Sequence, residues 1–235
     1  GSVNTPPIGN SFTINGNLSI QITDNKNDST KNDSASTSGI AFHAGKSSLT
    51  ANDSIFIETS SKAIDGDAYS LGVTIQNLGA AASSSGSRPA IGENTVSFNK
   101  LNIKLLSTTE GGEFAEAYGV EMRGNSSSTI DELEVSAKAG GAQVNYAQGI
   151  LATDQYELSG GTITINKADI TTVIEDYGNA IGVVSFLDSA NTGSTIHIEN
   201  GSISAQSMDG QGAAYGVYVK GQSSTVTLGS DTAES

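Results

Sequence analysis

The sequence has no cysteine and no tryptophan among its 235 residues. Without cysteine the chain has no disulfides, no thiolate metal sites and no cysteine nucleophile. This absence does not assign a cellular compartment, because disulfides are an option in secreted proteins and not a requirement.

Basic residues are also scarce. Eleven Lys and Arg against 25 Asp and Glu give a formal net charge of −14, and the two arginines, Arg88 and Arg123, lie in no basic patch. Phosphate binding needs clustered Lys or Arg, so we expect neither nucleic acid nor an anionic membrane surface as a partner. No apolar run approaches the roughly 18 residues of a membrane helix, so we expect no membrane insertion.

The apolar content nevertheless allows a folded core. Hydrophobic residues make up 36% of the chain and 28 residues are glycine, whereas charged residues are only 15%. A chain of this length supports one domain or two small ones. Regularly recurring β-branched residues argue against disorder.

A repeat runs through the chain, and it predicts the fold. Six segments combine a glycine with a following aliphatic residue, and the glycines lie 33, 47, 30, 33 and 34 residues apart. The segments are Gly39-Ile40-Ala41-Phe42, Gly72-Val73-Thr74-Ile75, Gly119-Val120-Glu121-Met122, Gly149-Ile150-Leu151-Ala152, Gly182-Val183-Val184-Ser185 and Gly216-Val217-Tyr218-Val219.

Each repeat continues with two more runs in which apolar and polar residues alternate. Val96-Ser97-Phe98 and Ile163-Thr164-Ile165 represent the second run, and Leu101-Asn102-Ile103 and Leu133-Glu134-Val135 the third. Alternation over three to five positions is typical of half-buried β-strands. We therefore predict an all-β protein, a right-handed parallel β-helix of about seven coils with three short strands each. At the usual spacing of strands the rod would be roughly 30 Å long.

The predicted domain boundaries follow from the repeat. Residues 10–229 form a single β-helix domain, with loop insertions near 23–38 and 76–92, the second of which explains the 47-residue spacing. Residues 1–9 begin with Gly1-Ser2, a pair typical of cloning, and are expected to be a lead-in without a signal peptide; residues 230–235 are expected to be a tail. Asn-rich corners such as Asn15-Gly16-Asn17 should separate the second and third strands, because Asn and Gly tolerate left-handed backbone.

From Phe12 to Leu228, the chain resembles the passenger domains of autotransporters, the secreted parts of Gram-negative type V surface proteins. The resemblance is carried by the absence of Cys, the acidic and Ser/Thr/Asn/Gly-rich composition, and the repeats Ala117-Tyr118-Gly119-Val120 and Ala214-Tyr215-Gly216-Val217. It implies a β-helix that projects from the bacterial cell surface and presents adhesive surfaces. The resemblance does not extend to the protease branch, because no Gly-x-Ser-x-Gly motif is present.

One outward column is the best candidate for binding. It holds the residues two positions after each repeat glycine: Ala41, Thr74, Glu121, Leu151, Val184 and Tyr218. Leu151, Val184 and Tyr218 should form a small exposed apolar strip on adjacent coils, and such strips tend to mark interaction sites. Two alternatives stay open, a loop that covers the strip or a bulge that turns Val184 and Phe186 inward.

Carboxylates offer an enzymatic alternative, because polysaccharide lyases and hydrolases also use parallel β-helices. Asp131, Glu132 and Glu134 share one coil, and Glu121 lies close to Arg123. Alternation directs Glu132 and Glu134 to solvent, which favours an ordinary acidic surface.

Two acidic loops could hold Ca²⁺, but their spacing matches neither the EF-hand nor the nonapeptide repeat. They contain Asp24, Asp28 and Asp33 in one loop, and Asp65-Gly66-Asp67 in the other. We therefore expect no metal site and no cofactor.

The sequence as a whole favours an adhesin or adhesive stalk at the bacterial cell surface, and not an enzyme. Its expected partner is a host glycan or protein, or another copy of itself. The binding residues would be Glu121, Leu151, Val184 and Tyr218. The alternatives are a carbohydrate-active β-helix enzyme and a passive structural spacer.

Overall fold

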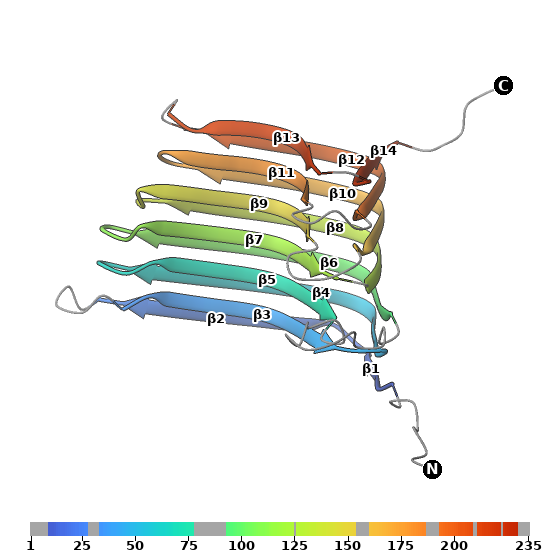
Figure 1. The fold of residues 1–235 in the computed structure, drawn as a ribbon. Helices are drawn as coiled ribbons and strands as arrows, with labels where there is room; N and C mark the ends of the chain where they lie inside the picture. Colours follow the sequence, from blue (N-terminus) through green and yellow to red (C-terminus); the bar gives the residue numbers. More distant parts are fainter. Residues whose placement is uncertain are drawn as a thin grey trace, which may run out of the picture.

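The computed structural model consists of parallel β-strands stacked as a solenoid (Figure 1). It describes residues 9–27, 33–77, 93–124, 126–153, 160–186, 193–208, 211–221 and 223–229, and these contain no helix. Sheet A contains β1 (Ser11–Ile14), β2 (Leu18–Lys26), β4 (Ser48–Ala63), β6 (Asn94–Thr109), β8 (Ser126–Gly140), β10 (Thr162–Ile174), β12 (Thr195–Ser207) and β14 (Thr225–Leu228). Sheet B contains β3 (Ala35–Ala44), β5 (Ala68–Asn77), β7 (Phe114–Arg123), β9 (Val144–Thr153), β11 (Gly178–Phe186) and β13 (Ala213–Lys220).

The chain alternates between the two sheets, and each turn stacks on the one before. Sheet A follows the order β1-β4-β6-β8-β10-β12-β14, with β2 also paired to β4, and sheet B follows β13-β11-β9-β7-β5-β3. Every pairing is parallel, for example β6 with β8 and β7 with β9. The predicted parallel β-helix is therefore confirmed, with about six turns.

The second and third runs of each repeat lie in one long, bent strand of sheet A. In β6 the apolar residues Phe98 and Leu101 both face the core, while Asn99 between them is exposed. The register with β8 passes from Phe98 to Lys100 without pairing Asn99, which marks the corner. Each turn was predicted to have three short strands, and it has two continuous ones, one in each sheet.

Asparagine side chains join neighbouring turns at this corner, as the sequence suggested. The Asn52 side-chain amide donates to Asn15 Oδ1 at 2.7 Å, and the Asn99 amide donates to the Asn52 carbonyl at 3.1 Å. Further along, the Asn166 amide donates to Asp131 Oδ1 at 2.9 Å. These bonds fix the register of the corner from turn to turn.

Aliphatic columns fill the interior. One column in sheet A is Ile57, Ile103, Val135, Ile170 and Ile203, and the first four are at most 2% exposed. It packs against sheet B, whose column Val73, Val120, Ile150 and Val183 is fully buried. Burying one such side chain contributes about 1.5–3 kcal/mol, and only stacking of turns achieves it.

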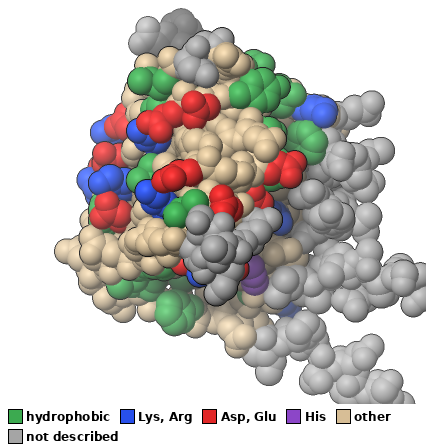
Figure 2. Space-filling model, turned by 90° about the vertical axis from the view of Figure 1, so that its left-hand side faces the viewer, with side chains coloured by type: hydrophobic (Ala, Val, Ile, Leu, Met, Phe, Trp, Pro, Cys, Tyr) green, Lys and Arg blue, Asp and Glu red, His purple; other side chains and the backbone are tan. Residues whose placement is uncertain are grey.

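Acidic side chains gather where sheet A strands turn into sheet B strands, on the face shown in Figure 2. Some of them hold the turns together. Asp67 Oδ1 accepts the backbone N–H of Glu113 and of Phe114, both at 2.9 Å, and Asp176 accepts that of Gly141 at 2.8 Å. The acidic loops therefore include structural carboxylates.

The first insertion is shorter than predicted. Strand β2 continues to Lys26 and β3 begins at Ala35, so both ends of the predicted 23–38 excursion are strand. Alternation of half-buried and exposed residues continues through Asp24, whose carboxylate accepts the Ser36 N–H at 3.0 Å. Residues 78–92 of the second insertion lie outside the described residues.

Candidate binding groove

A groove crosses the outer face of sheet B from β7 to β13, with a volume of about 570 Å³. Its lining comes from four strands: Glu116, Tyr118, Glu121, Arg123, Tyr146, Gln148, Leu151, Thr153, Asn179, Ile181, Val184, Phe186, Tyr215 and Tyr218. This volume lies within the usual range for small-ligand sites.

The repeat glycines create the groove, because they draw each strand toward the core. A Cβ atom on Gly119 would lie 2.6 Å from Val135 Cγ1, and one on Gly149 would lie 2.3 Å from Ile170 Cγ2. No side chain fits at such distances, so glycine lets the two sheets approach closely.

Alternation changes phase at the glycine. In β7 the residues Ala117 and Val120 are both fully buried, so Tyr118 and Glu121 face outward on either side of Gly119. The same happens on β9 and β11. Outward side chains therefore form rows on both sides of the glycine column, and these rows line the groove.

The register arranges the lining as four rows that run from turn to turn. Before the glycine lie the rows Glu116–Tyr146–Asn179 and Tyr118–Gln148–Ile181–Tyr215. After it lie the rows Glu121–Leu151–Val184–Tyr218 and Arg123–Thr153–Phe186–Lys220. Strand β7 contributes charged groups and β11 and β13 contribute apolar and aromatic ones, so the groove changes from polar to apolar along its length.

The predicted binding residues thus lie side by side, but they are less exposed than expected. Glu121, Leu151, Val184 and Tyr218 are consecutive register partners. Val184 is only 4% exposed and Glu121 2%, whereas Leu151 and Tyr218 are half-buried. The expectation of an exposed strip was wrong for Val184, because the longer outward side chains on either side of this row enclose it as the floor of a groove.

An ion pair closes the polar end. Arg123 donates to Glu121 Oε1 from Nε at 2.9 Å and from Nη2 at 2.5 Å, and both residues belong to β7. The Glu121 side chain is 3% exposed and that of Arg123 34%. A buried carboxylate needs such a partner, and the fork of the guanidinium fixes its orientation.

Glu116 lies on the other side of the glycine, in a different environment. Burial raises the pKa of its carboxyl, and the charges of Glu121 and Asp67 act in the same direction. A hydrogen bond from the Tyr118 hydroxyl and the positive charge of Arg123 oppose them. Burial likewise raises the pKa of the Tyr118 and Tyr146 hydroxyls, which are therefore neutral donors.

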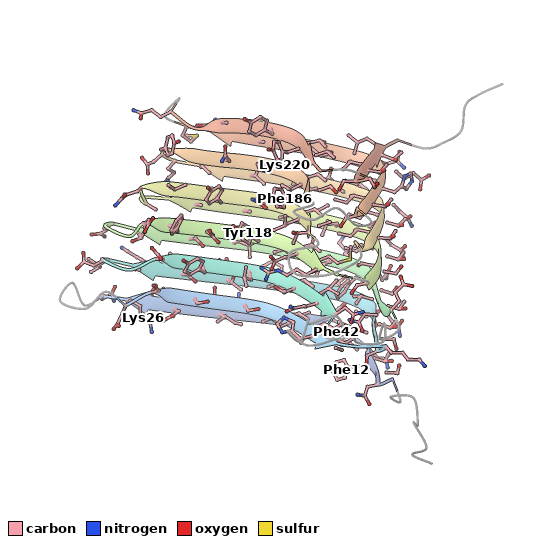
Figure 3. The ribbon with its side chains drawn as sticks, in the orientation of Figure 1. Phe12, Lys26, Phe42, Tyr118, Phe186 and Lys220 are labelled. Atoms are coloured by element: carbon pink, nitrogen blue, oxygen red, sulfur yellow. The ribbon has the colours of Figure 1, made fainter. Side chains whose placement is uncertain are left out.

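Aromatic groups dominate the other end. The rings of Tyr215 and Tyr218 lie 5.6 Å apart at 53°, and the Lys220 ammonium lies 4.9 Å from the centre of the Phe186 ring. Figure 3 labels Tyr118, Phe186 and Lys220 on strands β7, β11 and β13. Such tilted pairs and cation–π contacts hold the rings in defined positions.

The other candidate residues lie away from the groove. Glu132 and Glu134 are exposed on the outer face of sheet A, where Lys100 pairs with Glu132 at 2.8 Å. The described residues form no cluster of three or more histidines or carboxylates suited to a metal ion, and Asp28 lies outside them. Asp24 and Asp67 accept backbone hydrogen bonds instead.

The half of the groove that precedes the repeat glycines was not anticipated. Glu116, Tyr118, Tyr146, Gln148 and Tyr215 precede the repeat glycines, and uninterrupted alternation assigns Tyr118 and Glu121 to opposite faces. The signal was nevertheless present, because Ala117-Tyr118-Gly119-Val120 has small or aliphatic residues at positions 117 and 120, which both fit the core.

The fold and the groove define a β-solenoid that carries a surface cleft with polar, aromatic and aliphatic sections. No family model, curated protein or solved structure matches the chain. Within the described residues there is no helix of the length and apolarity needed to cross a membrane.

Proposed function

We propose that this protein is a bacterial surface adhesin whose sheet B groove binds a glycan chain. The observation that carries the proposal is the groove itself, in which an aromatic and aliphatic floor lies beside hydrogen-bonding side chains. Sugar rings have apolar faces and hydroxyl edges, so they need both kinds of surface at once.

The lining supplies these two kinds of contact. Tyr215, Tyr218 and Leu151 offer apolar area to the face of a sugar ring. Gln148 and Asn179 carry amides that can donate to and accept from hydroxyls. The groups lie on paired strands, so they are positioned before a ligand binds, which reduces the entropic cost of binding.

The shape suits a chain ligand. The groove crosses four strands, from β7 to β13, and successive strands repeat its rows at about 4.8 Å. A linear glycan lying along the rows would contact several turns of the solenoid. The location at the cell surface comes from the resemblance to autotransporter passengers and is part of the proposal.

A glycan array followed by calorimetry tests the proposal. Tyr218→Ser and Leu151→Ser should each weaken the binding of an identified glycan by roughly tenfold, because each removes an apolar contact. Leu106→Ser is the matched control, since Leu106 is 38% exposed on sheet A, away from the groove. Val184 is unsuitable, because a polar residue at this buried position would also destabilise the fold.

Three results would contradict the proposal. If Leu106→Ser reduced binding and Tyr218→Ser did not, the binding site would lie on sheet A and not in the groove. If the protein associated with itself, or bound a host protein that carries no glycan, its ligand would be a protein and not a glycan. If the protein bound no glycan and no protein, the passive spacer would be the better account.

A carbohydrate-active enzyme is the second candidate, and the two groove glutamates favour it. Burial raises the pKa of Glu116, as a general acid requires, while Glu121 forms an ion pair with Arg123. The adhesin proposal predicts that a bound oligosaccharide stays intact over days. Cleavage that both Glu116→Gln and Glu121→Gln abolish would make the enzyme the better account.

A further inference from the structure

Glu116 is a partly buried carboxylate that no cation of the described residues accompanies in an ion pair. Arg123 lines the same groove, and its guanidinium donates two hydrogen bonds to Glu121. Tyr69 on β5 and Tyr146 on β9 are the register partners of Glu116. The carboxylate thus has tyrosines on both adjacent strands, and Arg123 acts on it through its charge alone.

Gln148, at the same end of the groove, carries an acceptor atom without a hydrogen-bond partner. The Oε1 atom of Gln148 is buried without a hydrogen bond, and Gln148 is the register partner of Tyr118. A buried acceptor without a donor costs free energy, so a ligand that donates a hydrogen bond would gain from meeting it.

These groups share one preference. A carboxylate, an amide oxygen and the faces of tyrosine rings all attract a positively charged hydrogen-bond donor. The net charge of −14 further favours cations near the surface. We propose that Glu116, Tyr118, Tyr146 and Gln148 form a subsite for the cationic amino group of a sugar, within the glycan groove.

The inference rests on the proposed function and specifies its ligand. A glycan of amino sugars would place a ring on Tyr215 and Tyr218 and a charged nitrogen at Glu116, at opposite ends of one groove. A neutral glycan would bring no positive charge to the Glu116 carboxylate. The groove therefore prefers sugars with a free or alkylated amino group to their acetylated counterparts.

Binding at this subsite should depend on pH. Asp67 from the turn before β5, Tyr69 on β5, Tyr146 on β9, and Tyr118, Glu121 and Arg123 on β7 surround or face Glu116. A bound cation stabilises the ionised carboxylate, so cation binding releases the proton that Glu116 holds at low pH. The affinity for a cation consequently rises with pH through the raised pKa of Glu116.

Calorimetry with two glucosamine oligomers of equal length tests the subsite. One oligomer is N-acetylated and neutral, and the other is N-guanidinylated, so that it keeps N–H donors and its charge does not titrate between pH 4 and pH 8. We expect the guanidinylated oligomer to bind about tenfold more tightly at pH 8 than at pH 4. We also expect Glu116→Gln to remove this pH dependence and to reduce the preference for the guanidinylated over the N-acetylated oligomer at pH 8.

Glu134→Gln is the matched control, because it removes the same charge from the exposed face of sheet A. Equal losses in Glu116→Gln and Glu134→Gln would mean general electrostatic attraction and would overturn the subsite. Equal binding of both oligomers, lost in Tyr218→Ser, would overturn the subsite but keep the glycan groove. Binding of a trimethyllysine peptide without either oligomer, or no binding at all, would overturn the proposed function as well.

Discussion

Single residues decide where this solenoid has a groove and what the groove contains. Glu121 and Glu116 lie five positions apart on β7, yet their surroundings differ. Glu121 is buried and its Oε1 accepts two hydrogen bonds from Arg123, while Glu116 accepts one from the Tyr118 hydroxyl and forms no ion pair with a cation of the described residues. Two carboxylates of one strand thus acquire distinct properties from their neighbours alone.

This difference predicts an effect on stability. A raised pKa means that folded Glu116 binds its proton more tightly than the unfolded chain does. The resulting stabilisation is present at low pH and is lost as pH rises through the folded pKa. Glu116→Gln carries no charge, so it should melt higher than the unaltered protein at pH 8 and at nearly the same temperature at pH 4. Scanning calorimetry at both pH values measures this.

Glu134→Gln provides the comparison, because its exposed carboxylate should change the melting temperature little at either pH. A Glu116→Gln variant that is less stable at pH 8 would mean that the carboxylate supports the fold. The Glu116 carboxylate would then be explained by the stability of the fold, without a role in binding.

Among the elements, every strand of sheet B has a glycine at mid-strand, whereas in sheet A only β12 does, at Gly201. The sheet B glycine lets Ile170 and its column pack against the backbone, and it reverses the phase of the outward residues. The groove is thus a consequence of close packing between the sheets.

A pair of glycine substitutions isolates this contact. Gly149→Ala should cost about 1–3 kcal/mol, because its Cβ would lie 2.3 Å from Ile170 Cγ2 and 2.6 Å from the Gly182 carbonyl oxygen. Gly216→Ala in the same column should be neutral or slightly stabilising, since nothing lies within 4 Å of its Cβ. Chemical denaturation of both variants gives the two values, and equal effects would contradict the packing account.

The sequence revealed the strands more completely than it revealed the groove. The spacing of the repeat and the alternation of apolar and polar residues were enough to predict the β-helix. They also placed Leu151 and Tyr218 in one column with the correct register. The row of Tyr118 and Gln148 was missed, because strict alternation fails at a glycine that packs against the opposite sheet. The burial of Val184 also depends on neighbouring turns, which no single repeat shows.

For the whole molecule, stacking makes the inner turns the most stable. Strands β6 to β11 have paired neighbours on both sides, whereas β1, β2, β3, β13 and β14 end their sheets. Apolar residues of the end turns remain accessible: Phe12 is 60% exposed, Leu228 53% and Val219 45%. Stability in such repeats is a sum of nearest-neighbour contacts, so it should fall toward the ends.

Hydrogen exchange followed by mass spectrometry measures this gradient. Backbone amides of β7, β8 and β9 should exchange the slowest, and those of β2, β13 and β14 the fastest, with unfolding that progresses inward. Because the groove spans β7 to β13, its polar end should be more rigid than its aromatic end. Uniform protection along the chain would mean that the solenoid unfolds as one cooperative unit.

The central claim is that a glycan lies in the groove of sheet B, and tyrosine ring resonances report on it most directly. Four of the seven tyrosines, Tyr118, Tyr146, Tyr215 and Tyr218, line the groove, whereas Tyr69 and Tyr177 do not. Titration of ¹³C-tyrosine-labelled protein with an oligosaccharide that it binds should produce the largest shifts at the groove tyrosines, with Tyr215 and Tyr218 foremost. Largest shifts at Tyr69 or Tyr177, or saturable binding without a change at Tyr215 and Tyr218, would contradict the account.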